Sequence, residues 1–432
     1  MALDQARRAL GLPAASALAA DQQSVFFKYL LLGGLEDRQG WRRRWQRDPR
    51  QTGPDLYGCL ESALRSCRET LQDGPQAAAL DSSPQYRQRV VELAAAAVFS
   101  EQLAPEVCIA PWPVAAAELG LEGRWHHALC FAAAPLFPHE FYPLAVDALS
   151  RDASRGRPCF VLLGAHLDWL GPGGQLERLL WLDAERGYFR EAWLAQSLVP
   201  HSAQFLCLGR REQALHAQWS ERLKCPQLNP AGPAALADDK ARTLEGWRAA
   251  GVRVPGGQLL APGDLEGARG MLRERGEVVA KPNQGTEGEG VAFFAAGDEE
   301  VLEHHLEELW AQGEVLLQER ADELLYRDPQ TGRLHTLALR LNLIAEGGRY
   351  WAESGYAQVG SGAQQPAAGS QGSWCCPLDE VWPHLARRSS GQPAPVSEEA
   401  MAAILGAAEE AAGLFAGLML VGLDLILASG VF

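Results

Sequence analysis

The sequence predicts an α/β (α+β) protein in which a helical N-terminal region precedes a layered α/β domain and a sheet-rich C-terminal part. Three observations predict this class. Apolar residues recur at helical spacing over the first hundred residues, short apolar runs alternate with helical segments in the middle of the chain, and a glycine-rich loop joins two apolar runs at 277–294. The chain has 432 residues, which is too long for one compact core, so we expect two to three domains.

The N-terminal part, residues 1–103, is expected to be helical. Leu56, Leu60 and Leu64 share one side of a segment whose arginines lie on the other side, and this spacing predicts a helix over 57–71. The segments 22–32 and 85–102 show the same pattern.

The part from 104 to 235 is expected to be a layered α/β domain. Buried strands are predicted at 128–134, 159–163, 179–182 and 204–208, and helices at 142–150 and 211–223. Strands that alternate with helices predict a mainly parallel sheet. The proline-rich segment 225–233 is predicted to be a linker.

The stretch 277–294 reads EVVAKPNQGTEGEGVAFF, which is a strand, a loop and a second strand. Glycines at the spacing of Gly285, Gly288 and Gly290 let backbone N–H groups approach an anion closely. Lys281, just before the loop, adds a compact positive charge suited to phosphate. Only four of the 39 basic residues are lysines, so a lysine at this place is informative. The alternative is a glycine-rich hairpin with a surface lysine.

This pattern, Lys-Pro-x-x-Gly-Thr-x-Gly-x-Gly-Val, resembles the phosphate-covering loop of the ATP-grasp ligases. The segment from Asp239 through a helix to Ala-Gly-Val-x-Val-Pro resembles the entry to the same fold, with Lys240 at the position of a phosphate-binding lysine. The resemblance extends from about residue 237 to the C-terminus. It implies a lid subdomain at 236–317 and a C-terminal subdomain at 318–432. It also implies nucleotide contacts from Lys240, Lys281, Gly285, Thr286, Glu287, Gly288 and Gly290.

Two further strands complete the predicted nucleotide site. In the strand at 314–321, the resemblance implies that Glu319 and the backbone of Arg320 and Ala321 contact adenine. In the strand at 336–345, Arg340 and Asn342 share one face by period two. A buried arginine needs a partner, so we expect Arg340 to face a nucleotide or an acyl phosphate as a catalytic residue, together with Lys281.

The end of the chain contains Gly422-Leu423-Asp424 in a strand predicted at 418–427, after a helix at 397–415. In the ATP-grasp ligases a Gly-x-Asp strand precedes a Glu-x-Asn strand, and together they hold Mg²⁺. The resemblance therefore implies that Asp424 is a metal ligand. Because no Glu-x-Asn follows Asp424 before Phe432, we expect an incomplete C-terminal subdomain, in a fragment or a non-catalytic relative. A membrane tail anchor is the alternative for these apolar residues, at a cost of about 2.5–3.5 kcal/mol for placing Asp424 in the bilayer.

The resemblance implies an ATP-dependent ligase that joins a carboxylate to an amine through an acylphosphate, with ATP and Mg²⁺ as cofactors and small molecules, amino acids or peptides, as substrates. Two alternatives stay open: an ATP-binding module without ligase activity, and an α/β binding protein without nucleotide. The net charge of −15 argues against nucleic acid as a partner. Nine cysteines without CxxC spacing, and no signal peptide, indicate a reduced, cytoplasmic protein. The sequence leaves open whether the chain is a monomer or a homo-oligomer.

Overall fold

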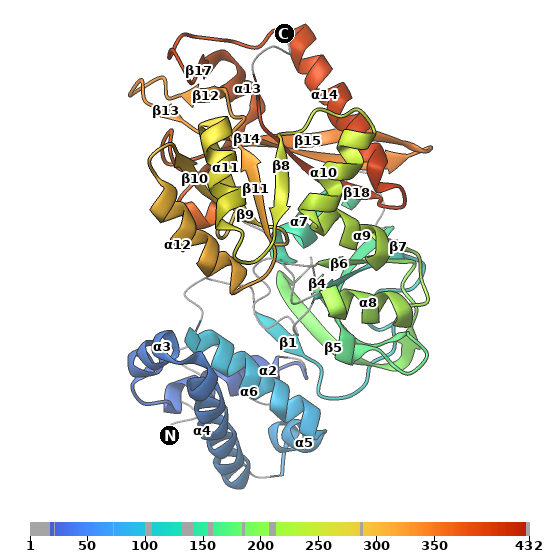
Figure 1. The fold of residues 1–432 in the computed structure, drawn as a ribbon. Coiled ribbons are helices and arrows are strands. Elements are labelled where there is room, and N and C mark those ends of the chain that lie inside the picture. The colour runs from blue at the N-terminus through green and yellow to red at the C-terminus, as the bar shows by residue number, and fades with distance from the viewer. Residues whose placement is uncertain are drawn as a thin grey trace. The chain divides into compact units, whose positions relative to one another are not determined.

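The structure is a computed structural model that describes residues 18–20, 22–71, 73–99, 106–131, 141–153, 159–183, 186–206, 213–285 and 288–428 (Figure 1). The chain divides into two compact units, Met1–Cys207 with Gln218–Gln227, and Leu208–Ala217 with Leu228–Phe432. Both units combine helices with β-sheets, which confirms the predicted α/β class. The finer division into four parts stays a prediction.

Within the described residues the first unit begins with five helices, and three of them match the helical segments predicted from apolar spacing. They are α2 (Gln23–Gly34), α3 (Arg38–Arg47), α4 (Pro49–Thr70), α5 (Pro75–Asp81) and α6 (Pro84–Phe99). The side chain of Asp48 accepts a hydrogen bond from Gln51 N, and Pro49 occupies the first turn, so α4 begins eight residues before the predicted helix. Leu56, Leu60 and Leu64 are buried, and they pack in one core with the other helices and the sheet that follows.

That sheet has seven strands in the order β1-β5-β4-β3-β2-β6-β7. The strands are β1 (Val107–Ile109), β2 (Trp125–Phe131), β3 (Phe160–His166), β4 (Leu176–Asp183), β5 (Tyr188–Leu198), β6 (Ser202–Leu206) and β7 (Gln227–Leu228), with helices α7 (Phe141–Ala153) and α8 (Gln213–Arg222). Strand β2 pairs in parallel with β3 and β6, and β1 with β5, whereas β4 pairs antiparallel with both β3 and β5. The sheet is therefore mixed, and the expectation of a mainly parallel sheet missed the β4–β5 hairpin.

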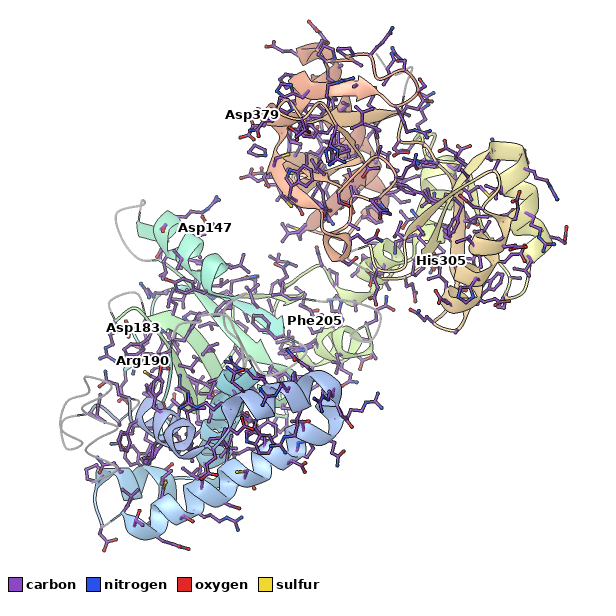
Figure 2. The ribbon with its side chains drawn as sticks, turned by 90° about the vertical axis from the view of Figure 1, so that its left-hand side faces the viewer. Asp147, Asp183, Arg190, Phe205, His305 and Asp379 are labelled. Carbon is purple, nitrogen blue, oxygen red and sulfur yellow. The ribbon has the colours of Figure 1, made fainter. Side chains whose placement is uncertain are left out.

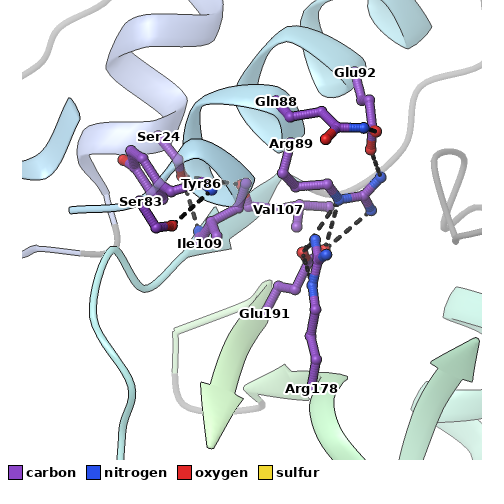
Figure 3. A network of polar contacts seen from close by, with 10 residues as sticks. All are labelled: Ser24, Ser83, Tyr86, Gln88, Arg89, Glu92, Val107, Ile109, Arg178 and Glu191. Atoms are coloured by element: carbon purple, nitrogen blue, oxygen red, sulfur yellow. Dashed lines mark hydrogen bonds and ion pairs between the residues drawn. The ribbon is translucent and has the colours of Figure 1, made fainter. Parts of the chain in front are cut away.

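Strand β5 was not among the predicted strands, and it has charged residues in its middle. Figure 3 shows how one of these charges, the carboxylate of Glu191, is paired. Glu191 is fully buried and pairs with Arg89 of α6, at 3.0 Å, and with Arg178 of β4. Burial alone would raise the pKa of Glu191, but the two arginines hold this pKa below its ordinary value. One residue away, Arg190 lies 3.7 Å from Asp183 across the hairpin (Figure 2).

The second unit contains a four-stranded antiparallel sheet in the order β10-β9-β11-β8. Its strands are β8 (Gly257–Leu260), β9 (Glu277–Pro282), β10 (Ala292–Ala295) and β11 (Val315–Glu319), and the nearby helices are α9 (Ala231–Asp238), α10 (Lys240–Ala249), α11 (Leu265–Arg275) and α12 (Glu299–Trp310). Val278, Ala280 and Leu317 face α11 and α12, whose Leu272 and Leu306 complete one buried core. Helices α11 and α12 do not cover the other face of the sheet.

A second antiparallel sheet follows in the order β16-β15-β14-β18. Its strands are β14 (Leu337–Glu346), β15 (Arg349–Val359), β16 (Trp374–Pro377) and β18 (Leu420–Leu425), and α14 (Glu398–Ala412) packs on its apolar face. A small sheet, β13-β12-β17, lies beside it, made of β12 (Leu324–Arg327), β13 (Leu334–His335) and β17 (Leu385–Arg387), near α13 (Leu378–Val381). The segment predicted as a strand at 418–427 contains β18. None of the helices in the described ranges is long and apolar enough to span a bilayer.

Candidate functional site

One face of the β16-β15-β14-β18 sheet is polar, and the candidate site begins there. Strand β14 alternates buried leucines, which pack against α14, with Arg340 and Asn342 on the opposite face. On β18 the residues directly across are Asp424, opposite Arg340, and Gly422, opposite Asn342. Residues paired in this way point to the same side of a sheet. The predicted shared face of Arg340 and Asn342 is thus confirmed, and Asp424 lies on it too.

Arg340 and Asp424 form an ion pair, with 2.8 Å between Nε and Oδ1. Gly422 makes room for this pair, because a Cβ atom at position 422 would lie 2.3 Å from Nη1 of Arg340. The Gly-x-Asp spacing therefore has a local physical reason: the glycine lets the guanidinium pass, and the aspartate two residues on binds it. The anionic partner that Arg340 required is, within the described chain, Asp424.

Two lysines extend this polar cluster. Lys281 is the next-to-last residue of β9, on the sheet face opposite to α11 and α12, and Lys240 is the first residue of α10. Burial and the charge of Lys240 lower the pKa of Lys281 to about 8, although Asp424 opposes this shift. Burial also lowers the pKa of Lys240, against the charges of Asp238, Asp424 and Asp239. The structure thus brings Lys240, Lys281 and Asp424 close enough to act on one another's charges.

The hydrogen bonds of the two ammonium groups differ. Lys240 Nζ donates to the carbonyl oxygens of Asn283, at 3.3 Å, and Gly285, at 2.9 Å, which leaves one of its three donors for a ligand. Lys281 Nζ makes no hydrogen bond or ion pair with any residue that the structure describes. A partly buried ammonium costs free energy unless an anion accompanies it. The pair of lysines is therefore suited to an anionic ligand.

The carboxylate of Asp424 responds to the same surroundings. Desolvation raises its pKa above the ordinary value, although Arg340, Lys281 and Lys240 all lower it. Among the described residues no group of three or more His, Cys, Asp or Glu side chains is arranged to hold a metal ion. Mg²⁺ needs about six oxygen ligands, and Asp424 gives one of its oxygens to Arg340. The described residues alone do not fit a protein-bound Mg²⁺.

The glycine loop after Lys281 needs its glycines for backbone conformation and for space. Gly285, Gly288 and Gly290 have φ values of +139°, +70° and +71°. A Cβ atom on Gly288 would lie 2.2 Å from the Cβ atom of Ala368. The predicted ligands Thr286 and Glu287 lie outside the described residues.

Side chains from two other segments bind the end of this loop. His305 of α12, labelled in Figure 2, donates its Nε2–H to the carbonyl oxygen of Gly290 at 3.0 Å. Gln371 donates to the carbonyl oxygens of Val291, at 2.8 Å, and Gly288, at 3.5 Å. The loop is therefore held against α12 and the 368–371 segment, and its remaining backbone N–H groups are the groups that could contact an anion.

The structure does not bring Glu319 to the lysines. Its carboxylate accepts from Gly256 N, at 2.6 Å, and pairs with Arg275 of α11, at 3.2 Å, so it lies on the helix-covered face of the sheet. Gln318, one residue earlier, lies on the same face as Lys281. It is 3% exposed, and its Nε2 is buried without a hydrogen-bond partner in the described chain. Period-two alternation along β11 places Gln318 on the Lys281 face only once the register of β11 against β9 is known.

Arg320 and Ala321 follow Glu319 at the end of β11. The Arg320 side chain is 1% exposed and binds Asp322 at 2.7 Å and Glu277 at 3.4 Å, so its guanidinium is committed to the protein interior. The backbone N–H of Arg320 donates to the carbonyl of Glu277, and the carbonyl of Ala321 accepts from Glu323. The adenine contacts implied for the backbone at 319–321 stay a prediction.

In one antiparallel sheet, a strand carries a lysine and leads into a glycine loop. In the other, a polar face carries an arginine and an aspartate. These features define an α/β protein with a candidate anion site. Solved structures similar to it include D-alanyl-alanine synthetase A from Vibrio cholerae O1 biovar eltor (11% identity, 71% of this chain and 86% of that chain, TM-score 0.46) and the D-alanine-D-alanine ligase from Coxiella burnetii (13%, 71% and 82%, 0.47). Another is the ATP-grasp ligase PsnB complexed with minimal precursor (15%, 70% and 86%, 0.39). These are ligases of the kind that the sequence resembles. No protein-family model matches the chain, and no curated protein matches its sequence. Because the TM-scores lie below 0.5, the function proposed below rests on this chain's own residues.

Proposed function

We propose that the chain is an ATP-dependent ligase that joins a carboxylate to an amine and releases ADP and phosphate. The observation that supports this function best is Lys281, a partly buried ammonium without a described partner, close to Lys240 and at the start of a glycine loop. Phosphate oxygens would supply the negative charge that this pair lacks. The carboxylate substrate is an amino acid or a short peptide.

The proposed reaction has two balanced steps. A carboxylate oxygen attacks the γ-phosphorus of ATP, and the bond between this phosphorus and ADP breaks. The amine nitrogen then attacks the acyl carbon, the bond to the phosphate oxygen breaks, and the proton that the amine loses passes to the released phosphate. Catalysis of such steps is mostly positioning and charge neutralisation. Lys240 and Lys281 hold ATP phosphates, the amides of the glycine loop cover the transferred group, and Arg340 binds the acyl phosphate after exchanging Asp424 for it.

Gln318 is the side chain suited to the base. It lies on the Lys281 face of the sheet, two positions along β11 from the residue paired with Lys281, and its buried Nε2 offers a hydrogen bond without an acceptor. A purine ring nitrogen would supply that acceptor once the Gln318 side chain turns out of its buried position on this face. Asp424 is the metal ligand proposed from the sequence. No step is assigned to Mg²⁺, since the described residues do not complete its coordination.

Release of ADP and phosphate from ATP in the presence of paired amino acids tests this function. We expect Lys281→Met to abolish release, whereas Lys224→Met, which removes an exposed lysine, leaves it unchanged. Equal release by wild type and Lys281→Met would overturn the assignment.

An ATP-binding module without ligase activity is the second candidate. One observation favours it: Arg340 and Asp424, the groups that a ligase would use for the acyl phosphate and the metal, are bound to each other. A thermal shift with ATP but no phosphate release with any amino-acid pair would support this candidate. No thermal shift with ATP would favour a binding protein without nucleotide.

A further inference from the structure

Asn283, two residues after Lys281, joins the two lysine-bearing segments. It is 1% exposed, and both its backbone and its side chain are fully used. Its carbonyl oxygen accepts from the backbone N–H of Lys240 at 3.2 Å and from Lys240 Nζ at 3.3 Å. Its side-chain Oδ1 accepts from the backbone N–H of Ala241 at 2.8 Å. A residue at the exit of β9 thus binds the first two backbone donors of α10.

The remaining donors of Asn283 fix its own orientation. Its Nδ2 donates to Asp239 Oδ1 and to Glu314 Oε2, both at 3.1 Å, and its backbone N–H donates to the carbonyl of Glu314 at 2.9 Å. Asp239 is also the N-cap of α10 and accepts from Arg242 N. The side-chain amide of Asn283 therefore uses its acceptor and both of its donors. Together these hydrogen bonds fix the start of α10 relative to the end of β9.

These contacts have two consequences for an anion site. The first N–H groups of α10 are occupied by Asn283 and Asp239, so this helix start does not itself receive the anion, and the positive charge must come from the lysine side chains. Because Lys281 precedes Asn283 by two residues and Lys240 is bound to Asn283 directly, Asn283 sets the separation of the two ammonium groups.

We infer that Asn283 is a positioning residue that holds Lys240 beside Lys281 for the phosphates of a nucleoside triphosphate. This inference rests on the proposed function, because it takes ATP as the ligand of the two lysines. Asn283 acts through Lys240 and does not itself touch the ligand. It therefore affects the phosphate part of the ligand and leaves the nucleoside part unchanged.

Calorimetric titration with ATP and with adenosine tests the inference. We expect Asn283→Ala to weaken ATP binding roughly tenfold, the loss of about one charge-assisted contact, and to leave adenosine binding within about twofold. Thr243→Ala is the matched control, since Thr243 is a buried residue of the same helix whose hydroxyl donates to Leu236 O at 2.8 Å without contacting Asn283. It should leave the binding of both ligands unchanged.

A variant that keeps the size of the side chain, Asn283→Asp, tests the inference if Asn283→Ala does not fold. Asn283→Asp retains the acceptor for Ala241 but places a carboxylate against Glu314, so ATP binding should weaken as in Asn283→Ala. Adding Glu314→Gln returns a donor to this contact and should recover at least about threefold of the loss. Unchanged ATP binding in Asn283→Ala or Asn283→Asp would overturn the inference, as would an equal loss of ATP and adenosine. If the wild type itself binds no ATP, the proposed function fails instead.

Discussion

Arg340 and Asp424 lie directly opposite each other on β14 and β18 and form a 2.8 Å ion pair on the polar face of their sheet. Desolvation raises the pKa of Asp424, while Arg340, Lys281 and Lys240 oppose this rise. The carboxylate is therefore the negative group of a mostly cationic cluster. A ligand with its own negative charge competes with Asp424 for the cations unless a metal ion joins the two.

Asp424→Asn tests whether Asp424 competes with the ligand for the cations or binds a metal ion together with it. We expect this variant to bind ATP at least as tightly as wild type without Mg²⁺, because one negative charge beside the phosphates is removed, and to gain nothing when Mg²⁺ is added. Calorimetry with and without Mg²⁺ measures both quantities. Asp379→Asn, which removes an exposed carboxylate of α13 (Figure 2), is the charge-matched control and should behave as wild type. An equal gain from Mg²⁺ in Asp424→Asn and wild type would mean that Asp424 is not a metal ligand.

Replacing Gln318 by leucine should raise the stability of the ligand-free protein but weaken ligand binding. The buried Nε2 of Gln318 has no partner in the described chain, and an unsatisfied buried donor costs about 1–3 kcal/mol. Gln318→Leu should therefore raise the free energy of unfolding of the ligand-free protein by about 1 kcal/mol, measured by urea denaturation. The same change should weaken adenosine and ATP binding equally, because both contain the base. Leu316→Met, a volume-conserving change on the same strand face, is the control. Unaltered adenosine binding in Gln318→Leu would exclude Gln318 from the base site.

The contrast between Gln318 and Glu319 shows which parts of the site can be predicted from the sequence and which cannot. The order of the strand, lysine, glycine loop and Gly-x-Asp segment follows from local patterns, and the structure places Lys240, Lys281, Arg340 and Asp424 in one cluster. Which of two neighbouring polar residues faces Lys281 depends on the register of β9 against β11, and a shift of one residue reverses every side chain. Asn283 was missed for a related reason, since its partners Asp239 and Glu314 are distant in sequence. In β5, the fully buried Glu191 pairs with Arg89 and Arg178 from two other elements, and local patterns do not show these pairings.

Gly288→Ala should destabilise the loop in two separable ways. The residue has φ +70°, which disfavours any Cβ, and the new methyl group would meet the Cβ of Ala368 at 2.2 Å. We expect a lower melting temperature and weaker ATP binding. Ala368→Gly in the same protein removes the clash but not the backbone strain, so it should restore part of each loss. Full restoration would mean that the backbone conformation costs nothing, and no restoration would mean that the 2.2 Å contact is relieved by movement of the loop.

The pKa of Lys281 predicts proton uptake when ATP binds. Burial and Lys240 lower this pKa from 10.5 to about 8. Between about pH 8 and 10.5 the unfolded chain binds a proton at Lys281 that the folded chain lacks, so the lowered pKa makes stability rise with pH through this window and leaves the cost fully present below pH 8. Lys281→Met should therefore raise the melting temperature of the ligand-free protein at pH 7.

Phosphates beside Lys281 favour its charged form, so ATP binding near pH 8.5 should take up a fraction of a proton. Calorimetry in buffers of different ionisation enthalpy measures this uptake. For the same reason, ATP affinity should fall as the pH rises above 8. Lys281→Met should show neither effect, and proton uptake of the same size in this variant would assign the titration to another group.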